Sequence, residues 1–335
     1  MTISSTILNV TGLMKDAKKI PGPGNDGTFA HIGANGGTEM MMRGLKQRVS
    51  PDLLDQFNII CSRVRSVDPI KHNVLWLHDT WDDPESEFLE KKENLDKFKK
   101  LIFVSNYQQS TFNMGRNVPY NKGIVLQNAI EPIPAFNKTK EVIKLIYHTT
   151  PHRGLEILVP VFEKICEVFP NVHLDIYSSF KIYGWDTRDK PYKQLFDRVR
   201  RHPNMTYHGY QSNETVRKAL QEAHIYAYPC IWPETSCISV IEAMSAGCTV
   251  VCPNLAALPE TCANFAMIYP WDEDVNRHAN IFANLLLMTI RNHWNENNQN
   301  KLKFQKNYFD NFYNWDLRAM QWNGLLKNLL SKKED

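Results

Sequence analysis

The chain lacks the features that mark membrane, fibrous and disordered proteins. No run of apolar residues reaches the roughly 18 to 20 that a membrane-spanning helix needs. Only 15 glycines and 18 prolines occur among 335 residues, too few for a collagenous or low-complexity chain. Hydrophobic residues make up 43% and charged residues 22%, as in globular proteins. A length of 335 residues predicts two domains rather than one.

Charge of one sign is not in excess. The chain has 39 lysines and arginines and 36 aspartates and glutamates, for a formal net charge of +3. This balance excludes a protein whose main partner is a nucleic-acid backbone. The first residues also lack the basic start, apolar run and small-residue cleavage site of a secretory signal. We therefore expect a cytoplasmic protein with at most peripheral membrane contact.

Cysteine spacings typical of a metal site are also missing. Cys248 and Cys252 are the only closely spaced pair among seven cysteines, and the apolar residues between them predict a strand. An extended strand does not curl around a zinc ion. The odd number of cysteines agrees with free thiols in a reducing compartment. No metal site is expected.

Short β-rich apolar runs alternate with amphipathic helical stretches along the chain. The runs carry consecutive apolar residues, which is typical of parallel strands covered on both faces. Their alternation with helices predicts doubly wound α/β architecture. Strands are expected at 5–10, 57–62, 72–78, 100–105 and 123–128, then at 142–148, 172–178, 205–209, 225–229, 248–253 and 265–270. Helices are expected at 37–48, 87–100, 154–169, 213–223 and 237–247 and after residue 273.

A break between two domains lies between the two sets of strands. Residues 130–140 contain two prolines, are largely polar and show no periodicity, which predicts a linker. The expected domains are residues 1–135 and 136–314. Ligands of such proteins bind at the carboxyl ends of the strands, in the cleft between the sheets.

Two glutamates flank the start of the helix expected after the strand at 225–229. Glu234 precedes the helix and Glu242 lies within it, so the two carboxylates can address different parts of one elongated ligand. The positive end of the helix offers free backbone N–H groups to an anion. These belong to Ser236, Cys237 and Ile238. The plainer alternative is that Glu234 only complements the helix dipole and Glu242 is solvated.

At these residues the chain resembles the retaining glycosyltransferases of family 4, within glycosyl transferases group 1. Their mark is two glutamates separated by seven residues, then Ala-Met-Ala/Ser-x-Gly and a strand. Here it stands as Glu234, Glu242, residues 243–247 and the strand TVV. The resemblance implies a GT-B fold, two Rossmann-like domains facing across a cleft, completed by a final helix at about 315–335 that crosses back to the N-terminal domain.

The resemblance also implies roles for these residues. Glu234 would lie against the donor sugar, and Glu242 would bind the ribose hydroxyls of the nucleotide. The backbone of residues 236–238 would hold the sugar and the diphosphate. Where the family usually has Gly-Phe-Gly, this chain has Thr235, Ser236 and Cys237, so the donor sugar stays open.

A second match lies between the expected strand 142–148 and the helix after it. The family pattern has an arginine and then a Lys-Gly pair; here His148 takes the arginine's place and Arg153–Gly154 the Lys-Gly place. A guanidinium binds a diphosphate with paired hydrogen bonds. We expect Arg153 to do so. Whether His148 also binds the diphosphate is left open. The alternative for Arg153 is a surface arginine near a helix start.

A third match is the pair Gly36–Gly37, before a helix that we expect Thr38 and Glu39 to cap. Two glycines let the backbone approach a ligand closely, and a helix N-terminus favours negative charge. By resemblance this loop faces the donor phosphates. The adjacent methionines 40–42 are expected in the core.

A fourth match is His78, at the end of the strand expected at 72–78, which points into the cleft. By resemblance it contacts the transferred sugar; the alternative is a structural histidine bonded to the backbone. Acidic residues follow it and are candidates to face the acceptor: Asp79, Asp82, Asp83 and Glu85.

One further segment completes the expected site, and a second resembles a metal site but is not expected to be one. His208, Gly209 and Tyr210 end a strand where the family holds the nucleotide base. Asp272, Glu273 and Asp274 look like a metal-binding motif of other sugar transferases, but we expect them to be acids at a helix start.

The resemblance implies a metal-independent transfer of a sugar from a UDP- or GDP-linked donor to an acceptor hydroxyl, with retained anomeric configuration and no cofactor. Glu234, His78 and Arg153 would be its catalytic residues. The acceptor is a glycan, a lipid-linked molecule or a protein. Two alternatives stay open: a donor-binding homologue that has lost catalysis, and a sugar-nucleotide epimerase of the same fold.

Overall fold

The computed structural model describes residues 36–331, which form two parallel sheets with helices on both faces. The first sheet has the order β1-β2-β3-β4 and the second the order β10-β9-β8-β5-β6-β7. The strand expected at 5–10 lies outside the described residues, and the other ten expected strands are confirmed. They are β1 Phe57–Cys61, β2 His72–Leu77, β3 Lys100–Phe103, β4 Gly123–Val125, β5 Ile143–Tyr147, β6 Val172–Ile176, β7 Met205–Tyr207, β8 Ile225–Ala227, β9 Thr249–Pro253 and β10 Met267–Tyr269.

The helices agree with the sequence pattern at most places. They are α1 Gly37–Arg48, α2 Pro51–Leu54, α3 Lys92–Leu95, α4 Asn106–Arg116, α5 Leu155–Val168, α6 Lys193–Arg201, α7 Asn213–Glu222, α8 Ile238–Ser245, α9 Leu258–Cys262, α10 Val275–Arg291, α11 Glu296–Phe312 and α12 Trp315–Ser331. Short 3-10 turns are η1 Pro84–Glu90, η2 Tyr120–Lys122, η3 Pro151–Arg153, η4 Phe180–Tyr183 and η5 Asp186–Tyr192.

One expected helix is wrong. Residues 87–100 form the end of η1, the single turn α3 and the start of β3 instead of one amphipathic helix. Lys91 between the two turns has extended backbone, with φ −91° and ψ 125°. The Asn94 side chain donates to the Phe88 carbonyl at 2.8 Å, which satisfies that acceptor without a continuous helix.

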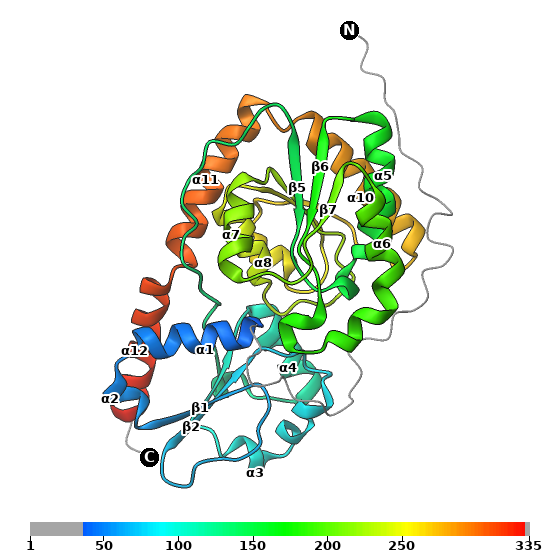
Figure 1. Cartoon of the computed structure of the whole chain (residues 1–335). Helices are drawn as coiled ribbons and strands as arrows, with labels where there is room; N and C mark the ends of the chain where they lie inside the picture. Colours follow the sequence, from blue (N-terminus) through cyan, green and yellow to red (C-terminus); the bar gives the residue numbers. More distant parts are fainter. Residues whose placement is uncertain (1–35, 332–335) are drawn as a thin grey trace.

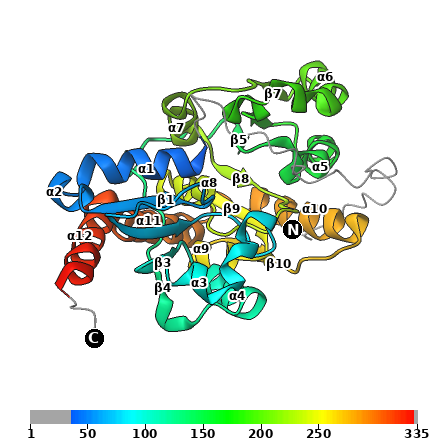
Figure 2. The ribbon, with the colours of Figure 1, turned by 90° about the horizontal axis from the view of Figure 1, so that it is seen from below.

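The first sheet buries alternate residues of β2 in two separate cores. Val74 and Trp76 pack toward α1 and α12. Leu75 and Leu77 pack toward η1, α3 and α4. This follows from the period of two in a strand and requires helices on both faces. Figure 2 shows α1 on one side of this sheet and α3 and α4 on the other.

The second sheet reverses its strand order between β5 and β8. In doubly wound sheets the crevice at such a reversal, outside the carboxyl ends of the strands, is where ligands bind. The loops after β5 and β8 therefore contain the residues to inspect first.

The last helices return the chain to the first sheet. Figure 1 shows α11 and α12 running from the half with β5 to the half with β1, where α12 lies beside α1. The Trp315 ring of α12 fills the space at Gly44, where an added Cβ would lie 2.0 Å from it, and the Trp322 ring is 4.9 Å from Trp76. Ile130, the first residue of the predicted linker, donates its N–H to Tyr313 O at 2.7 Å.

Candidate active site

The loops after β5 and β8 touch through their backbones. Gly154, with φ +123°, occupies the β5 loop in a conformation that side chains rarely adopt. An added Cβ there would fall 2.1 Å from the Pro229 carbonyl oxygen. Arg153, directly before Gly154, and Glu234, five residues after Pro229, meet beside this contact.

Arg153 and Glu234 form a buried ion pair through Nη1 and Oε1. Glu234 is 6% exposed, and the Tyr228 hydroxyl donates to the same carboxylate oxygen at 2.5 Å. Burial lowers the pKa of Arg153, but Glu234 raises it, and the net shift is upward. The guanidinium therefore stays charged in the crevice, and its Nε is buried without a hydrogen-bond partner among residues 36–331.

Glu242 has a different set of partners. Its carboxylate, 3% exposed, accepts from Arg217 Nη1 at 3.0 Å and from Asn213 Nδ2 at 3.2 Å. Burial raises the pKa of Glu242, and Arg217 opposes that shift. The other nitrogen of Arg217 donates to the Glu131 carbonyl at 2.7 Å. Glu242 is thus fixed, not solvated, which contradicts the plainer alternative for this residue.

Helix α8 starts one residue later than the expected range 237–247. Its first residue is Ile238 and its N-cap is Cys237, which makes no side-chain capping hydrogen bond. The first N–H groups of a helix have no partner inside it. The N-terminus of α8, which Ser236 and Cys237 precede, therefore remains suited to an anion.

The loop of Gly36 and Gly37 faces the other half of the molecule. An added Cβ at Gly36 would lie 2.6 Å from a ring carbon of Tyr183, and one at Gly37 would lie 3.0 Å from Ile238 Cδ1. The expected cap is wrong: α1 begins at Gly37 with Gly36 as N-cap, and Thr38 and Glu39 lie inside the helix. Met41 is buried and its two neighbours pack partly in the core, as expected.

His78 follows β2 at the edge of the crevice. The Thr235 hydroxyl donates to the His78 carbonyl at 2.7 Å, so the residue directly after Glu234 is in contact with His78. Burial lowers the pKa of His78 to about 4. Both ring nitrogens are shielded from solvent and make no regular hydrogen bond within the described part of the chain. A backbone contact with Trp76 opposes the downward shift of the His78 pKa, as it would for a histidine that binds the backbone.

His148 cannot supply the charge of the arginine that it replaces. Its ring lies 4.8 Å from the Tyr226 ring. Burial lowers the pKa of His148 to about 4, so it is neutral near pH 7.

The predicted base pocket is a stacked pair of rings. His208 lies parallel to Tyr177 at 4.2 Å between ring centroids, with an interplanar angle of 3°. Its Nε2 is 2.7 Å from Asp175 Oδ1. Gly209 has φ +64° and directs the chain toward Tyr210.

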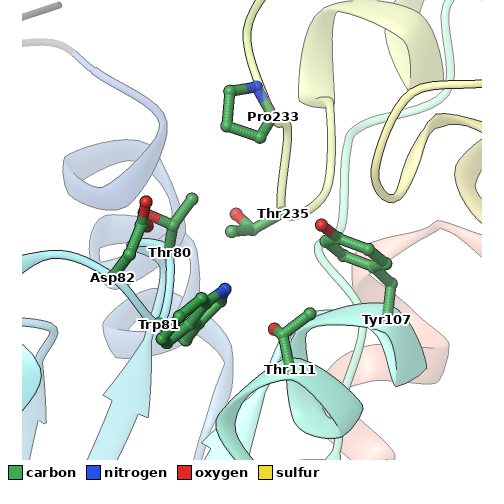
Figure 3. Close-up of a pocket in the computed structure, with 7 residues that line it drawn as sticks. All are labelled: Thr80, Trp81, Asp82, Tyr107, Thr111, Pro233 and Thr235. Carbon is green, nitrogen blue, oxygen red and sulfur yellow. The ribbon is translucent and has the colours of Figure 1, made fainter. Parts of the chain in front are cut away.

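A hollow of about 60 Å³ lies between the two halves beside Glu234. Figure 3 shows its side chains converging from three segments, with Trp81 and the ring of Tyr107 on different sides of Thr235. Its lining residues are Thr80, Trp81, Asp82, Tyr107, Thr111, Pro233 and Thr235. Asp82 is the one acidic residue of the expected acceptor group that lines it. Asp83 instead caps η1.

No metal cluster of three or more His, Cys, Asp or Glu side chains occurs within residues 36–331. All seven cysteines are free. Asp274 caps α10 and Asp272 pairs with Arg277 at 2.8 Å, which confirms the interpretation of these acids as helix-start residues. No helix in the described part of the chain has both the length and the apolar character that crossing a membrane requires.

Several residues that meet at the site carry no motif. Tyr228 follows β8, so its position at a strand end could have identified it. Tyr183, Asn213 and Arg217 come from other segments and give no signal of their own; only the fold brings them to the glycine loop and to Glu242.

Residues 127–301 match the protein family described as Glycosyl transferases group 1. This match spans more than half of the chain. The chain belongs to this family.

Comparison with single proteins agrees with that membership. The O-antigen chain mannosyltransferase B of Escherichia coli is 24% identical over 218 residues, or 61% of this chain and 55% of its own. The chain thus spans about half the length of that relative.

Solved glycosyltransferase structures share the fold. The glycosyltransferase from Rickettsia africae ESF-5 superimposes with a TM-score of 0.65 at 13% identity, over 88% of this chain and 83% of its own. The Anabaena protein Alr3699/HepE, solved in complex with UDP, gives 0.61 at 15% identity, over 77% and 72%. The expected α/β architecture of GT-B type is confirmed.

Proposed function

We propose that the protein is a retaining glycosyltransferase of family 4. It moves a sugar from a UDP- or GDP-linked donor to an acceptor hydroxyl, in the cytoplasm and without a metal or other cofactor. Residues 1–135 with the final helix form the acceptor side, and residues 136–314 form the donor side. The observation that carries the proposal is the buried Arg153–Glu234 pair at the strand-order reversal, opposite the glycine loop.

The diphosphate binds among Arg153, the N-terminus of α8 and the loop of Gly36 and Gly37. Negative charge grows on the diphosphate as its bond to the sugar breaks, and fixed positive groups stabilise that charge most in a dry site. When the donor enters, Arg153 exchanges part of its contact with Glu234 for phosphate oxygens. The Glu234 carboxylate then turns to the sugar hydroxyls, next to His78.

The nucleoside lies along α8. Glu242, held by Arg217 and Asn213, accepts hydrogen bonds from the two ribose hydroxyls. The base packs in the loop of His208, Gly209 and Tyr210, where the stacked His208–Tyr177 pair gives a rigid wall. The relative solved with UDP supports a nucleotide donor.

Transfer with retention needs no covalent intermediate. The acceptor hydroxyl attacks the anomeric carbon from the face that the diphosphate leaves, and its proton passes to the leaving phosphate oxygen. Both glutamates in the crevice are held by arginines, so neither is a free acid or base of the kind that epimerisation requires.

One observation favours a second candidate, a donor-binding protein without turnover. His148 is neutral where the family pattern has a cation, which leaves less positive charge for the leaving group. This candidate predicts nucleotide binding without release of diphosphate.

The two candidates separate in one experiment. The protein is incubated with UDP- and GDP-sugars, with and without EDTA, and mass spectrometry follows free UDP or GDP and free sugar. Release from one donor, lost in Arg153→Ala and Glu234→Ala but kept in the surface control Arg277→Ala and in EDTA, supports the transferase. Binding of a donor with no release supports the second candidate. The anomeric configuration of the product, read by NMR, decides retention.

A further inference from the structure

Trp81 is a large aromatic side chain held in place at the surface. Its side chain is 37% exposed. The ring lies on Gly115, where an added Cβ would fall 2.2 Å from ring carbon Cε3. Arg116 Nε donates to the Trp81 carbonyl at 2.8 Å, and its guanidinium carbon lies 5.8 Å from the ring centroid. The indole is therefore positioned before any ligand arrives.

Polar groups surround this aromatic surface. The hydroxyls of Thr80, Tyr107 and Thr111 and the carboxylate of Asp82 line the same hollow (Figure 3). An aromatic face beside hydroxyl and carboxylate groups suits a sugar ring, which has apolar C–H faces and an edge of hydroxyls. A lipid chain needs a continuous apolar lining instead.

The hollow is also small. Its volume of about 60 Å³ has room for a few waters or part of one ring, since a cavity needs about 10 to 15 Å³ of this volume to hold one water. A polypeptide segment would need an extended groove with backbone partners.

The hollow adjoins the reacting centre of the proposed function. Thr235 lines it and directly follows Glu234. The Thr235 hydroxyl also bonds to the His78 carbonyl at 2.7 Å. A ring that stacks on Trp81 would therefore lie beside Thr235, the residue that links Glu234 to His78.

We propose that the acceptor is a saccharide whose terminal ring stacks on Trp81 and whose hydroxyls bind Asp82 and the threonines around it. This inference rests on the proposed function, and it selects the glycan among the three acceptor classes that the sequence left open.

Saturation-transfer NMR tests the inference with methyl glycosides of mannose, glucose and N-acetylglucosamine, in the presence of UDP or GDP. At least one glycoside should receive saturation from the wild-type protein. Trp81→Ala should weaken its binding by about tenfold or more, because the stacking surface is lost. Trp81→Phe, which keeps an aromatic face, should retain most of the binding. Asp82→Asn should weaken binding, and the matched control Tyr120→Ala, an exposed aromatic outside the hollow, should not change it.

The outcomes distinguish the inference from the function on which it rests. Calorimetric binding of UDP or GDP is measured on the same samples. If a nucleotide binds but no glycoside receives saturation, the saccharide inference is wrong while the donor site stands. Equal glycoside binding by wild type and Trp81→Ala also overturns it. If neither nucleotide binds, the proposed function itself fails.

Discussion

The two sides of the crevice are built in different ways. On the side of the second sheet, charged groups are buried in pairs that join separate elements: Arg153 with Glu234, and Arg217 with Glu242. The ring of His208 lies 2.7 Å from Asp175 Oδ1 on the same side. The first half contributes the backbone of Gly36 and Gly37, the ring of His78 and the half-exposed hollow at Trp81. A diphosphate needs fixed charges at fixed spacing, whereas an acceptor needs a shape that many loops can make.

The largest effect is expected from Arg153→Ala. This change removes the buried cation that we assign to the leaving diphosphate, and donor turnover should fall by about 10² to 10³-fold in kcat/KM. Diphosphate release from the preferred donor measures it. Retention of more than half of the turnover would show that the buried pair does not serve catalysis.

A folding effect must be separated from this loss. Removing one partner of a buried ion pair leaves the other charge unpaired, which destabilises a protein by about 3 to 5 kcal/mol. The double variant Arg153→Ala/Glu234→Gln has no unpaired charge, so it should recover much of the stability but none of the turnover. Urea unfolding and diphosphate release on the same samples provide the comparison.

The next largest effect is expected at the backbone contact between Gly154 and Pro229, next to the Arg153–Glu234 pair. Gly154→Ala should reduce the free energy of unfolding by about 3 kcal/mol, because the new methyl group meets the Pro229 carbonyl and the residue has positive φ. Gly247→Ala is the matched control. Gly247 has φ +71°, and an added Cβ would meet nothing within 4 Å, so only the cost of positive φ for alanine applies, which is about 1 kcal/mol. Equal losses in the two variants would contradict a tight contact between the loops.

A smaller effect should follow from Glu242→Gln. Loss of the charged acceptor for the ribose hydroxyls should weaken UDP or GDP binding by about tenfold, as expected for a hydrogen bond to a charged group. Isothermal calorimetry measures this binding, and the 2′,3′-dideoxy nucleotide, which lacks the ribose hydroxyls, is the control. If Glu242 binds the ribose, the variant and the wild type should bind this analogue alike. If Glu242 serves structure alone, the variant should lose affinity for both nucleotides.

The sequence predicts the features that depend on local patterns of residues. The ten strands after residue 36 were predictable because consecutive apolar residues mark parallel strands, and the glutamate pair because its spacing is tied to α8. The places of His78 and Arg153 after β2 and β5 were predictable from the strand pattern, whereas their roles come from the resemblance and stay predictions. The helix at 87–100 failed because its charged pattern suits a helix, whereas the buried residues Leu89, Leu95 and Phe98 pack better on separate turns.

Partners that come from unrelated segments were not predictable. Arg217 lies on an ordinary amphipathic helix, and only the strand order of the second sheet brings that helix to Glu242. Tyr183 reaches Gly36 through a 3-10 turn with no periodic signal. The Trp81 hollow depends on Gly115, whose lack of a side chain has meaning only once the ring above it is known.

The smallest effect concerns pH and tests whether His148 adds a second cation to the donor side. The pKa of folded His148 is about 4, against 6.5 for an unperturbed histidine. Above pH 6.5 the ring is neutral in both states and contributes nothing to stability. As the pH falls from 6.5 to 4, the unfolded chain binds a proton that the folded chain excludes, so the free energy of unfolding decreases. His148→Gln should therefore reduce the pH dependence of the urea unfolding midpoint across this window. The dependence should not vanish, because burial lowers the pKa values of five other histidines in the same direction, namely His78, His152, His224, His278 and His293. Diphosphate release should show no His148-dependent rise between pH 8 and 6. Such a rise would mean that the ring becomes charged beside the donor, and the donor side would then have two cations instead of one.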